Sequence, residues 1–108
     1  MKQIIYYKTK SGKCPYLDWY NKLDSTTKNR IRSRLERVEE NNFGDYKKID
    51  SNLSELRFKF GSGYRIYYFE YENAIIILLL AGDKSSQKRD ILKAKEYIKD
   101  FEERYKND

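Results

Sequence analysis

The 108-residue chain contains no histidine and only one cysteine, Cys14. It therefore cannot build zinc sites of the His and Cys type, nor Ser-His-Asp or Cys-His nucleophilic sites. Any general acid or base must come from Lys, Arg, Tyr, Asp or Glu, and we predict neither a metal nor a cofactor. A single cysteine also excludes an internal disulfide framework, so nothing in the sequence indicates secretion.

Long apolar segments are missing as well. The most apolar run, IIILLL from Ile75 to Leu80, is far shorter than the roughly 20 residues that a membrane-spanning helix needs. No signal-like apolar stretch follows Met1. We therefore expect a cytoplasmic protein with no membrane association. Repeats, low-complexity tracts and linkers are also lacking, which predicts one domain over residues 1–108.

Positive charge is in excess, with 23 Lys and Arg against 17 Asp and Glu, a net charge of +6 and a pI near 9.3. The excess lies mainly in residues 1–24 and 46–69, each with five basic and two acidic side chains. Such a balance favours an anionic partner, most commonly a nucleic acid.

The periodicity of apolar residues predicts four strands and three helices. A first strand covers Ile4 to Tyr7, and Pro15 begins a short helix that extends to Leu23. Asp24, Ser25 and Thr26 offer N-cap oxygens for a second helix, which ends near residues 41–44. Three further strands are expected at 53–60, 64–71 and 74–80, followed by a C-terminal helix with an apolar stripe. That stripe comprises Ile91, Ala94, Ile98, Phe101 and Tyr105.

The resulting order is β-α-α-β-β-β-α, which is typical of an α+β fold. We expect a helical hairpin on one face of a small, mostly antiparallel sheet. The opposite face would then carry Glu55, Arg57 and Lys59 outward, because side chains alternate along a strand. We expect the stripe of the C-terminal helix to pack internally. Ser85 and Ser86 are the simplest caps for that helix.

Three cations are candidates for a site. Arg57 and Arg65 lie on neighbouring strands joined by the turn Gly61–Ser62–Gly63. Antiparallel pairing can bring either Arg57 or Lys59 within cross-strand reach of Arg65. Like charges placed so close favour an anion between them. Lys84 follows the buried strand and is expected at the same end of the sheet.

Further basic and aromatic residues surround these three. Lys47, Lys48 and Lys59 are candidates for phosphate contacts, and Tyr68 belongs to a strongly aromatic strand. Cations neutralise phosphates and aromatic rings stack on unpaired bases, so the set suits single-stranded RNA. The same residues also fit a solvated strand face with tyrosines that simply fill the core.

The same cations fit metal-free RNA cleavage. The ribose 2′-OH attacks the adjacent phosphorus in line, and arginines stabilise the charge that develops on the phosphate oxygens. A lysine or tyrosine then exchanges protons with the nucleophile or leaving oxygen. Lys84, Lys59 and Tyr68 are candidates for that exchange, and the residues alone do not rank them.

Three motifs in order resemble the RelE/ParE toxin superfamily, and most closely its HigB-like branch of phage-derived or addiction-module killer proteins. They are ELR at Glu55–Arg57, GYRIYY at Gly63–Tyr68 and GDKSSQ at Gly82–Gln87. YLDWYNKL at Tyr16–Leu23 is similar to that branch's N-terminal helix. The resemblance spans residues 4 to about 100.

This resemblance implies a RelE-like, microbial-RNase-like fold and the toxin of a type II toxin–antitoxin system. Such a toxin is an endoribonuclease that cuts mRNA on the ribosome, arrests translation and growth, and is neutralised by a helix-turn-helix antitoxin (HigA-like) in a hetero-oligomer. By motif position, Arg57 and Arg65 would bind the phosphate or stabilise the transition state. Lys84 would be a further basic or acid–base residue, and Lys47 and Lys48 would contact RNA.

Two alternatives fit the same sequence. ParE-like members of the superfamily act on gyrase through protein–protein contact, and the fold suits that activity equally well. A non-catalytic basic module that only binds RNA is the second alternative. Some members of the family use a histidine, and this chain has none. The general acid and base are therefore not assigned.

Overall fold

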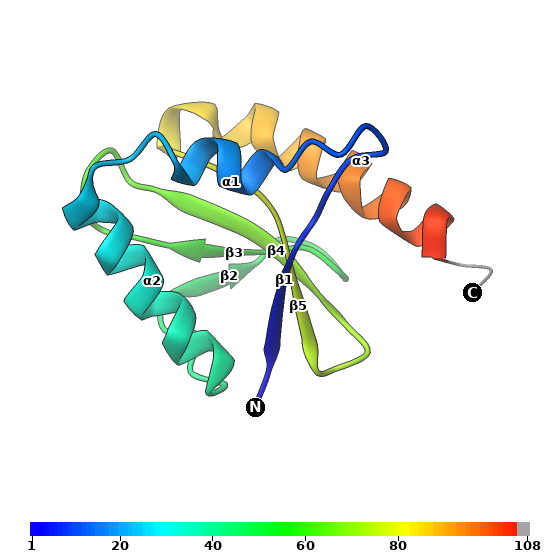
Figure 1. Ribbon diagram of the computed structural model, residues 1–108, viewed down its shortest axis with the longest axis horizontal. Helices are drawn as coiled ribbons and strands as arrows, with labels where there is room; N and C mark the ends of the chain where they lie inside the picture. The colour runs from blue at the N-terminus through cyan, green and yellow to red at the C-terminus, as the bar shows by residue number, and fades with distance from the viewer. Residues whose placement is uncertain (106–108) are drawn as a thin grey trace.

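A five-stranded sheet with helices on its two faces makes up the protein, whose computed structural model describes residues 1–105 (Figure 1). The elements follow one another as β1 (Gln3–Tyr6), α1 (Pro15–Tyr20), α2 (Ser25–Glu39), β2 (Tyr46–Lys48), β3 (Ser54–Arg57), β4 (Arg65–Tyr71), β5 (Ile75–Gly82), the 3-10 helix η1 (Lys84–Ser86) and α3 (Gln87–Tyr105). The α+β class and the C-terminal helix are confirmed.

The element order and the sheet need correction. The spatial order is β1-β5-β4-β3-β2, and β1 pairs with β5 in parallel, so the sheet is mixed. The other three pairings are antiparallel. The predicted order missed β2, because its three residues, Tyr46, Lys47 and Lys48, are all exposed and carry no apolar pattern. This short edge strand exists because its three residues pair with β3 in an antiparallel ladder.

The helical hairpin covers one face of the sheet. Asp24 caps α2, since its carboxylate accepts a hydrogen bond from the Thr27 backbone N–H at 2.7 Å. Ile31 and Val38 of α2 are fully buried against the sheet, as the periodicity predicts. The core on this side combines buried residues of α1, α2 and alternate strand positions, namely Tyr16, Ile31, Leu35, Val38, Leu56, Phe58, Ile66, Tyr68, Ile76 and Leu78.

The second face of the sheet is covered by α3, which in Figure 1 runs behind α1 and on to the C-terminus. Ala94 and Ile98 are buried there against Tyr67, Ile77 and Leu79. The internal packing expected for the stripe of α3 is therefore confirmed for Ala94 and Ile98 and for the partly buried Ile91 and Phe101, whereas Tyr105 is 46% exposed. The expectation of a fully outward-facing set on β3 is wrong in part, because α3 shields this face.

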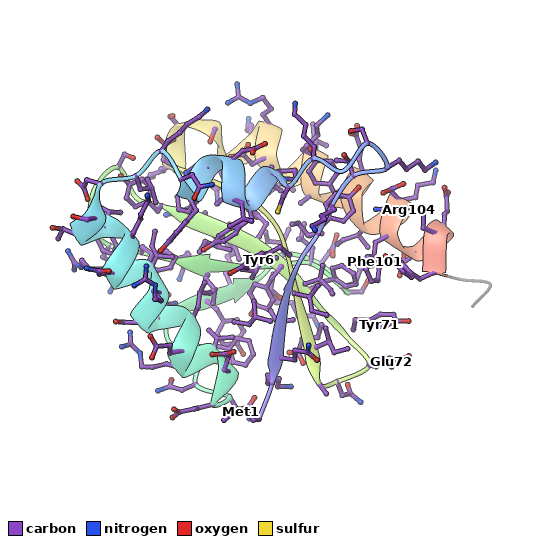
Figure 2. All side chains as sticks on the ribbon, viewed as in Figure 1. Met1, Tyr6, Tyr71, Glu72, Phe101 and Arg104 are labelled. Carbon is purple, nitrogen blue, oxygen red and sulfur yellow. The ribbon has the colours of Figure 1, made fainter. Side chains whose placement is uncertain are left out.

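The C-terminal half of α3 is tied to the sheet and to the N-terminal strand. Figure 2 shows Phe101 beside Tyr71 of β4, and their rings meet edge to face with centroids 5.3 Å apart. The Tyr7 hydroxyl donates to the Asp100 carboxylate at 2.5 Å, and Arg104 donates to the same carboxylate at 3.1 Å. Burial and the Asp100 partner raise the pKa of Tyr7. The Tyr7 hydrogen bond lowers the pKa of Asp100.

Among residues 1–105, no helix is long and apolar enough to cross a membrane.

Candidate functional site

Arg57 and Arg65 face each other across β3 and β4. The two residues are register partners, and Arg65 is also the partner of Gly82 on β5. Directly opposed residues of an antiparallel pair have Cβ atoms roughly 5 Å apart. Of the two residues expected within reach of Arg65, Arg57 and Lys59, the structure places Arg57 directly opposite it. The row Arg57, Arg65, Gly82 marks the end of the sheet at which the β3–β4 turn and η1 meet.

Lys84 lies at this same end. Its backbone N–H donates to the carbonyl of Ser62, in the β3–β4 turn, at 3.4 Å. A Cβ placed on Gly63 would lie 3.4 Å from Arg65 Nη1 and 3.5 Å from the Cβ of Lys84, so these two basic residues border the same glycine. Gly63 itself has φ +77°, a conformation that suits glycine. The structure therefore brings Arg65 and Lys84 together, as predicted.

Asp83, rather than Ser85 or Ser86, caps the segment that carries Lys84. Its carboxylate accepts the Ser85 backbone N–H at 2.9 Å and the Ser62 hydroxyl at 3.2 Å. The Ser85 hydrogen bond lowers the pKa of Asp83. The Ser86 hydroxyl in turn accepts a hydrogen bond from the Asp83 backbone N–H at 3.3 Å, which completes a capping box. This cap fixes the start of η1, and with it the exposed Lys84, against the β3–β4 turn.

Each arginine of the pair already has a partner. Arg57 Nη2 is 2.9 Å from Asp45 Oδ1, and Arg57 Nε donates to the same oxygen at 3.2 Å. That hydrogen bonding holds the pKa of Asp45 below its usual value. Arg65 Nη1 donates to the Gly63 carbonyl at 2.9 Å. Asp45 therefore relieves part of the repulsion between the two guanidinium groups, so part of the negative charge expected beside them comes from the protein itself.

Arg34 joins α2 to this end of the sheet. Its guanidinium donates to the backbone carbonyls of Phe43 at 3.0 Å, Asp45 at 2.6 Å and Arg57 at 2.9 Å. It also lies 4.8 Å from the ring centroid of Phe58. Burial lowers the pKa of Arg34, but an arginine stays protonated. Arg34 is thus a structural cation that positions the backbone on both sides of the Asp45–Arg57 ion pair.

A basic groove runs beside Arg34, between α2 and the end of β3. It has a volume of about 350 Å³ and combines five cations with one acid, Asp45, and two aromatic rings. Its lining residues are Arg30, Arg34, Arg37, Asp45, Arg57, Phe58, Lys59 and Phe60. The Arg30 guanidinium lies 3.8 Å from the centroid of the Phe60 ring. This basic groove is suited to a polyanion, and it includes the predicted residues Arg57 and Lys59.

The other predicted RNA-binding residues lie on different faces. Lys47 is the register partner of Glu55, on the face that α3 covers, whereas Lys48 is the partner of Ser54 on the α2 face. Tyr68 is only 3% exposed and stacks against Phe43, with centroids 5.7 Å apart and planes inclined by 26°. Burial raises the pKa of Tyr68 to about 12. Tyr68 therefore keeps its proton at neutral pH, which argues against a role as general base.

Behind Arg65 lies a buried polar cluster. Glu55 is 1% exposed and accepts hydrogen bonds from the Gln87 side-chain amide at 3.0 and 3.3 Å. Tyr67 is fully buried, and burial raises its pKa, with Glu55 and Asp90 adding to the effect. Within the described part of the chain, the Tyr67 hydroxyl and Arg65 Nε are buried without a hydrogen-bond partner. The expectation that Glu55 faces solvent is wrong.

Sequence reasoning missed Asp45, Arg34, Arg30, Arg37 and Gln87. Arg34 had a usable signal, because it lies three residues after Ile31 and four before Val38, within the apolar stripe of α2. Asp45 had none, since its partner depends on the pairing of β2 with β3. Chemically, the observed set can bind phosphates and stabilise negative charge. Among residues 1–105, no group of three or more His, Cys, Asp or Glu side chains could hold a metal ion.

Two comparisons bear on this arrangement. The family described as phage derived protein Gp49-like (DUF891) matches residues 18–105, which include the basic groove, the arginine pair and Lys84. An uncharacterized protein of Haemophilus influenzae is 41% identical over 78 residues, covering 71% of this chain and 79% of that protein.

Proposed function

Because the chain belongs to the family of Gp49-like phage-derived proteins, we propose that it is the toxin of a type II toxin–antitoxin system. The family is associated with such systems and related to RelE-like toxins. We propose further that the toxin is HigB-like, that it cleaves mRNA on the ribosome without a metal, and that a HigA-like helix-turn-helix antitoxin neutralises it. The small α+β fold with its mixed sheet is compatible with a RelE-like fold.

The observation that carries the proposal is the meeting of Arg57, Arg65 and Lys84 at one end of the sheet. A phosphate placed over Arg65 would meet a guanidinium that is already oriented by the Gly63 carbonyl. Such preorganised charge stabilises a pentacoordinate phosphorus more than it stabilises the ground state. The substrate's own 2′-OH would supply the nucleophile, so the protein would not need a nucleophilic side chain.

Lys84 is the better placed of the proposed proton-exchange residues. It is exposed and borders Arg65, whereas Tyr68 is buried on the other face and holds its proton. Lys84 would protonate the leaving 5′ oxygen or neutralise its charge. Lys59 and Lys47, both exposed, would contact more distant phosphates.

The test is cleavage of a reporter mRNA in a translation system reconstituted with purified ribosomes. We expect wild-type protein to produce discrete cuts and Arg65→Ala to reduce the rate on the order of a hundredfold. Lys99→Ala is the charge-matched control, because Lys99 is exposed on α3 away from the sheet end. Equal cleavage by wild-type protein and Arg65→Ala, or no cleavage by wild-type protein, would refute the mechanism. Inhibition of gyrase supercoiling that survives Arg57→Ala and Arg65→Ala would favour a ParE-like activity instead.

A further inference from the structure

A second hollow opens on the α2 face of the sheet, beyond the C-terminal end of α2. Its volume is about 670 Å³, within the range of roughly 300–1,000 Å³ that is usual for ligand sites. Its lining comes from the α2–β2 loop, from β2 and β3 with the loop between them, and from the end of β4 and its turn. Of the residues predicted above to act on or bind RNA, Lys48 and Tyr68 line it, whereas Arg57, Arg65 and Lys84 do not.

Aromatic rings form one side of this hollow. Phe43 stacks on the buried ring of Tyr68, and Tyr46 lies against Phe43 with centroids 5.8 Å apart and planes inclined by 55°. Phe43 thus packs on the buried ring of Tyr68, and the ring of Tyr46, which is 52% exposed, is the one accessible from solvent. Stacking of a base on such a ring contributes about 1–3 kcal/mol and does not require a particular base.

Amide side chains form much of the rest. Asn41, Asn42, Asn52 and Asn73 line the hollow, and each amide offers both hydrogen-bond donors and an acceptor. That mixture matches the edges of unpaired bases, which also carry donors and acceptors. Side chains that are purely apolar or of one charge would not serve this purpose.

The charges at the rim favour an anionic chain. Lys48 is exposed there. The only acid among the lining residues of the hollow is Glu70, and its carboxylate is paired with Lys2 at 2.9 Å. The rim therefore repels phosphate little, and the exposed Lys48 can attract it.

The hollow adjoins the basic groove. Phe43, Gly44 and Tyr46 line the hollow, while Asp45, within the same loop, lines the basic groove. The row of Lys48, Ser54 and Tyr68 lies three residues along the strands from the Arg57–Arg65 row, a distance of about 10 Å. A strand whose phosphates followed the basic groove would thus reach the hollow directly.

We propose that this hollow binds an unpaired base of single-stranded RNA, stacked on Tyr46, while the adjoining phosphates occupy the basic groove. The proposal rests on the proposed function only in taking RNA as the substrate. It adds a base-binding site, about 10 Å along the strands from the Arg57–Arg65 row, that would hold the strand at a fixed distance from the arginine pair.

The test is equilibrium binding of two labelled oligoribonucleotides to the intact protein, by fluorescence anisotropy without ribosomes. The two strands have equal length and charge, and one carries abasic residues throughout. We expect wild-type protein to bind the base-containing strand about 5- to 150-fold more tightly, which corresponds to the stacking energy given above. Tyr46→Ala should abolish this preference while leaving binding of the abasic strand unchanged.

Tyr105→Ala is the matched control, because Tyr105 is similarly exposed, at 46%, but lies on α3. It should keep the full preference. Lys48→Ala should weaken binding of the two strands equally and reduce the log–log salt slope by about 0.7. A wild-type protein that binds the two strands equally, or a Tyr46→Ala variant that keeps the preference, would overturn the proposal. So would a Tyr46→Ala variant that binds RNA normally and loses affinity for the antitoxin.

This experiment fails separately from the test of the proposed function. Base-dependent binding with no cleavage on ribosomes would refute the endonuclease activity and support the hollow as an RNA site. Arg65-dependent cleavage without base-dependent binding would refute the base site and support the endonuclease activity.

Discussion

Replacement of Arg34 by methionine should destabilise the protein strongly, although Arg34 takes no part in the proposed chemistry. The substitution keeps an unbranched side chain in the buried position and removes only the guanidinium. Three backbone carbonyls, those of Phe43, Asp45 and Arg57, lose their donors at 3.0, 2.6 and 2.9 Å. These carbonyls belong to the loop and strand that hold the Asp45–Arg57 ion pair.

The size of the effect can be bounded. A hydrogen bond to a charged group contributes about 1.5–3 kcal/mol, so simple addition for three bonds would give roughly 5–9 kcal/mol. Two effects reduce this sum. Burial of the guanidinium has a cost, seen in the lowered pKa of Arg34, and neighbouring bonds are not additive. We expect a loss of about 3 kcal/mol, of the order found when one partner of a buried charged contact is removed.

Urea unfolding measures this loss directly, provided that the slope m is unchanged. A loss of about 3 kcal/mol corresponds to a fall of roughly 12 °C or more in Tm for a domain of this size. Arg37→Met is the matched control, since Arg37 is exposed on the same helix and should change the free energy of unfolding by less than about 0.5 kcal/mol. If the two variants unfolded at the same urea concentration, the structural role assigned to Arg34 would be refuted.

Three further changes test other parts of the structure. Asp100→Asn should lower stability above about pH 4. The difference from wild type should disappear as pH falls through the lowered pKa of Asp100, because protonation ends its ionised contact with Tyr7. Urea unfolding between pH 2 and about 7 measures this difference in free energy. Tyr68→Phe should remove an alkaline loss of stability between about pH 10 and 12, because the folded state raises the pKa of Tyr68 to about 12. Stability equal to wild type at every pH in this range would contradict the assignment. Gly82→Ala should cost about 1–3 kcal/mol, because its Cβ would lie 2.1 Å from Asp90 Oδ2; thermal unfolding should show partial recovery when Asp90→Ala is added.

The sequence predicted the elements whose residues follow a clear period. Ile31, Leu35 and Val38 repeat at helical spacing and are buried in α2, and the stripe of α3 packs on the sheet through Ala94 and Ile98. That a cation of β3 or its end lies close to Arg65 was predictable too, because a short glycine turn limits which residues of two antiparallel strands can oppose each other, although it left Arg57 and Lys59 as alternatives. These are local features, and local pattern is enough to specify them.

Features that depend on distant segments were not predictable. The parallel pairing of β1 with β5 joins residues more than 70 positions apart and has no local signal. The burial of Glu55 requires α3 to cross the second face and to supply Gln87, which lies 32 residues away. Alternation on β3 correctly placed Glu55 and Arg57 on one face, but it could not say that another helix would cover part of that face.

The net charge of +6 therefore says less about partners than the position of each cation does. Arg34 directs its guanidinium to three backbone carbonyls, and Arg57 shares its own with Asp45, so neither is wholly available to an external anion. Lys59 and Lys84 are exposed at the end of the sheet. An incoming phosphate at Arg57 must compete with the Asp45 carboxylate at 2.9 Å, whereas at Arg65 the guanidinium donates to the neutral Gly63 carbonyl. A guanidinium is held more strongly by a carboxylate than by a neutral carbonyl, because both partners are then ionised. Arg65 and Lys84, rather than Arg57, should therefore carry most of the interaction with the scissile phosphate.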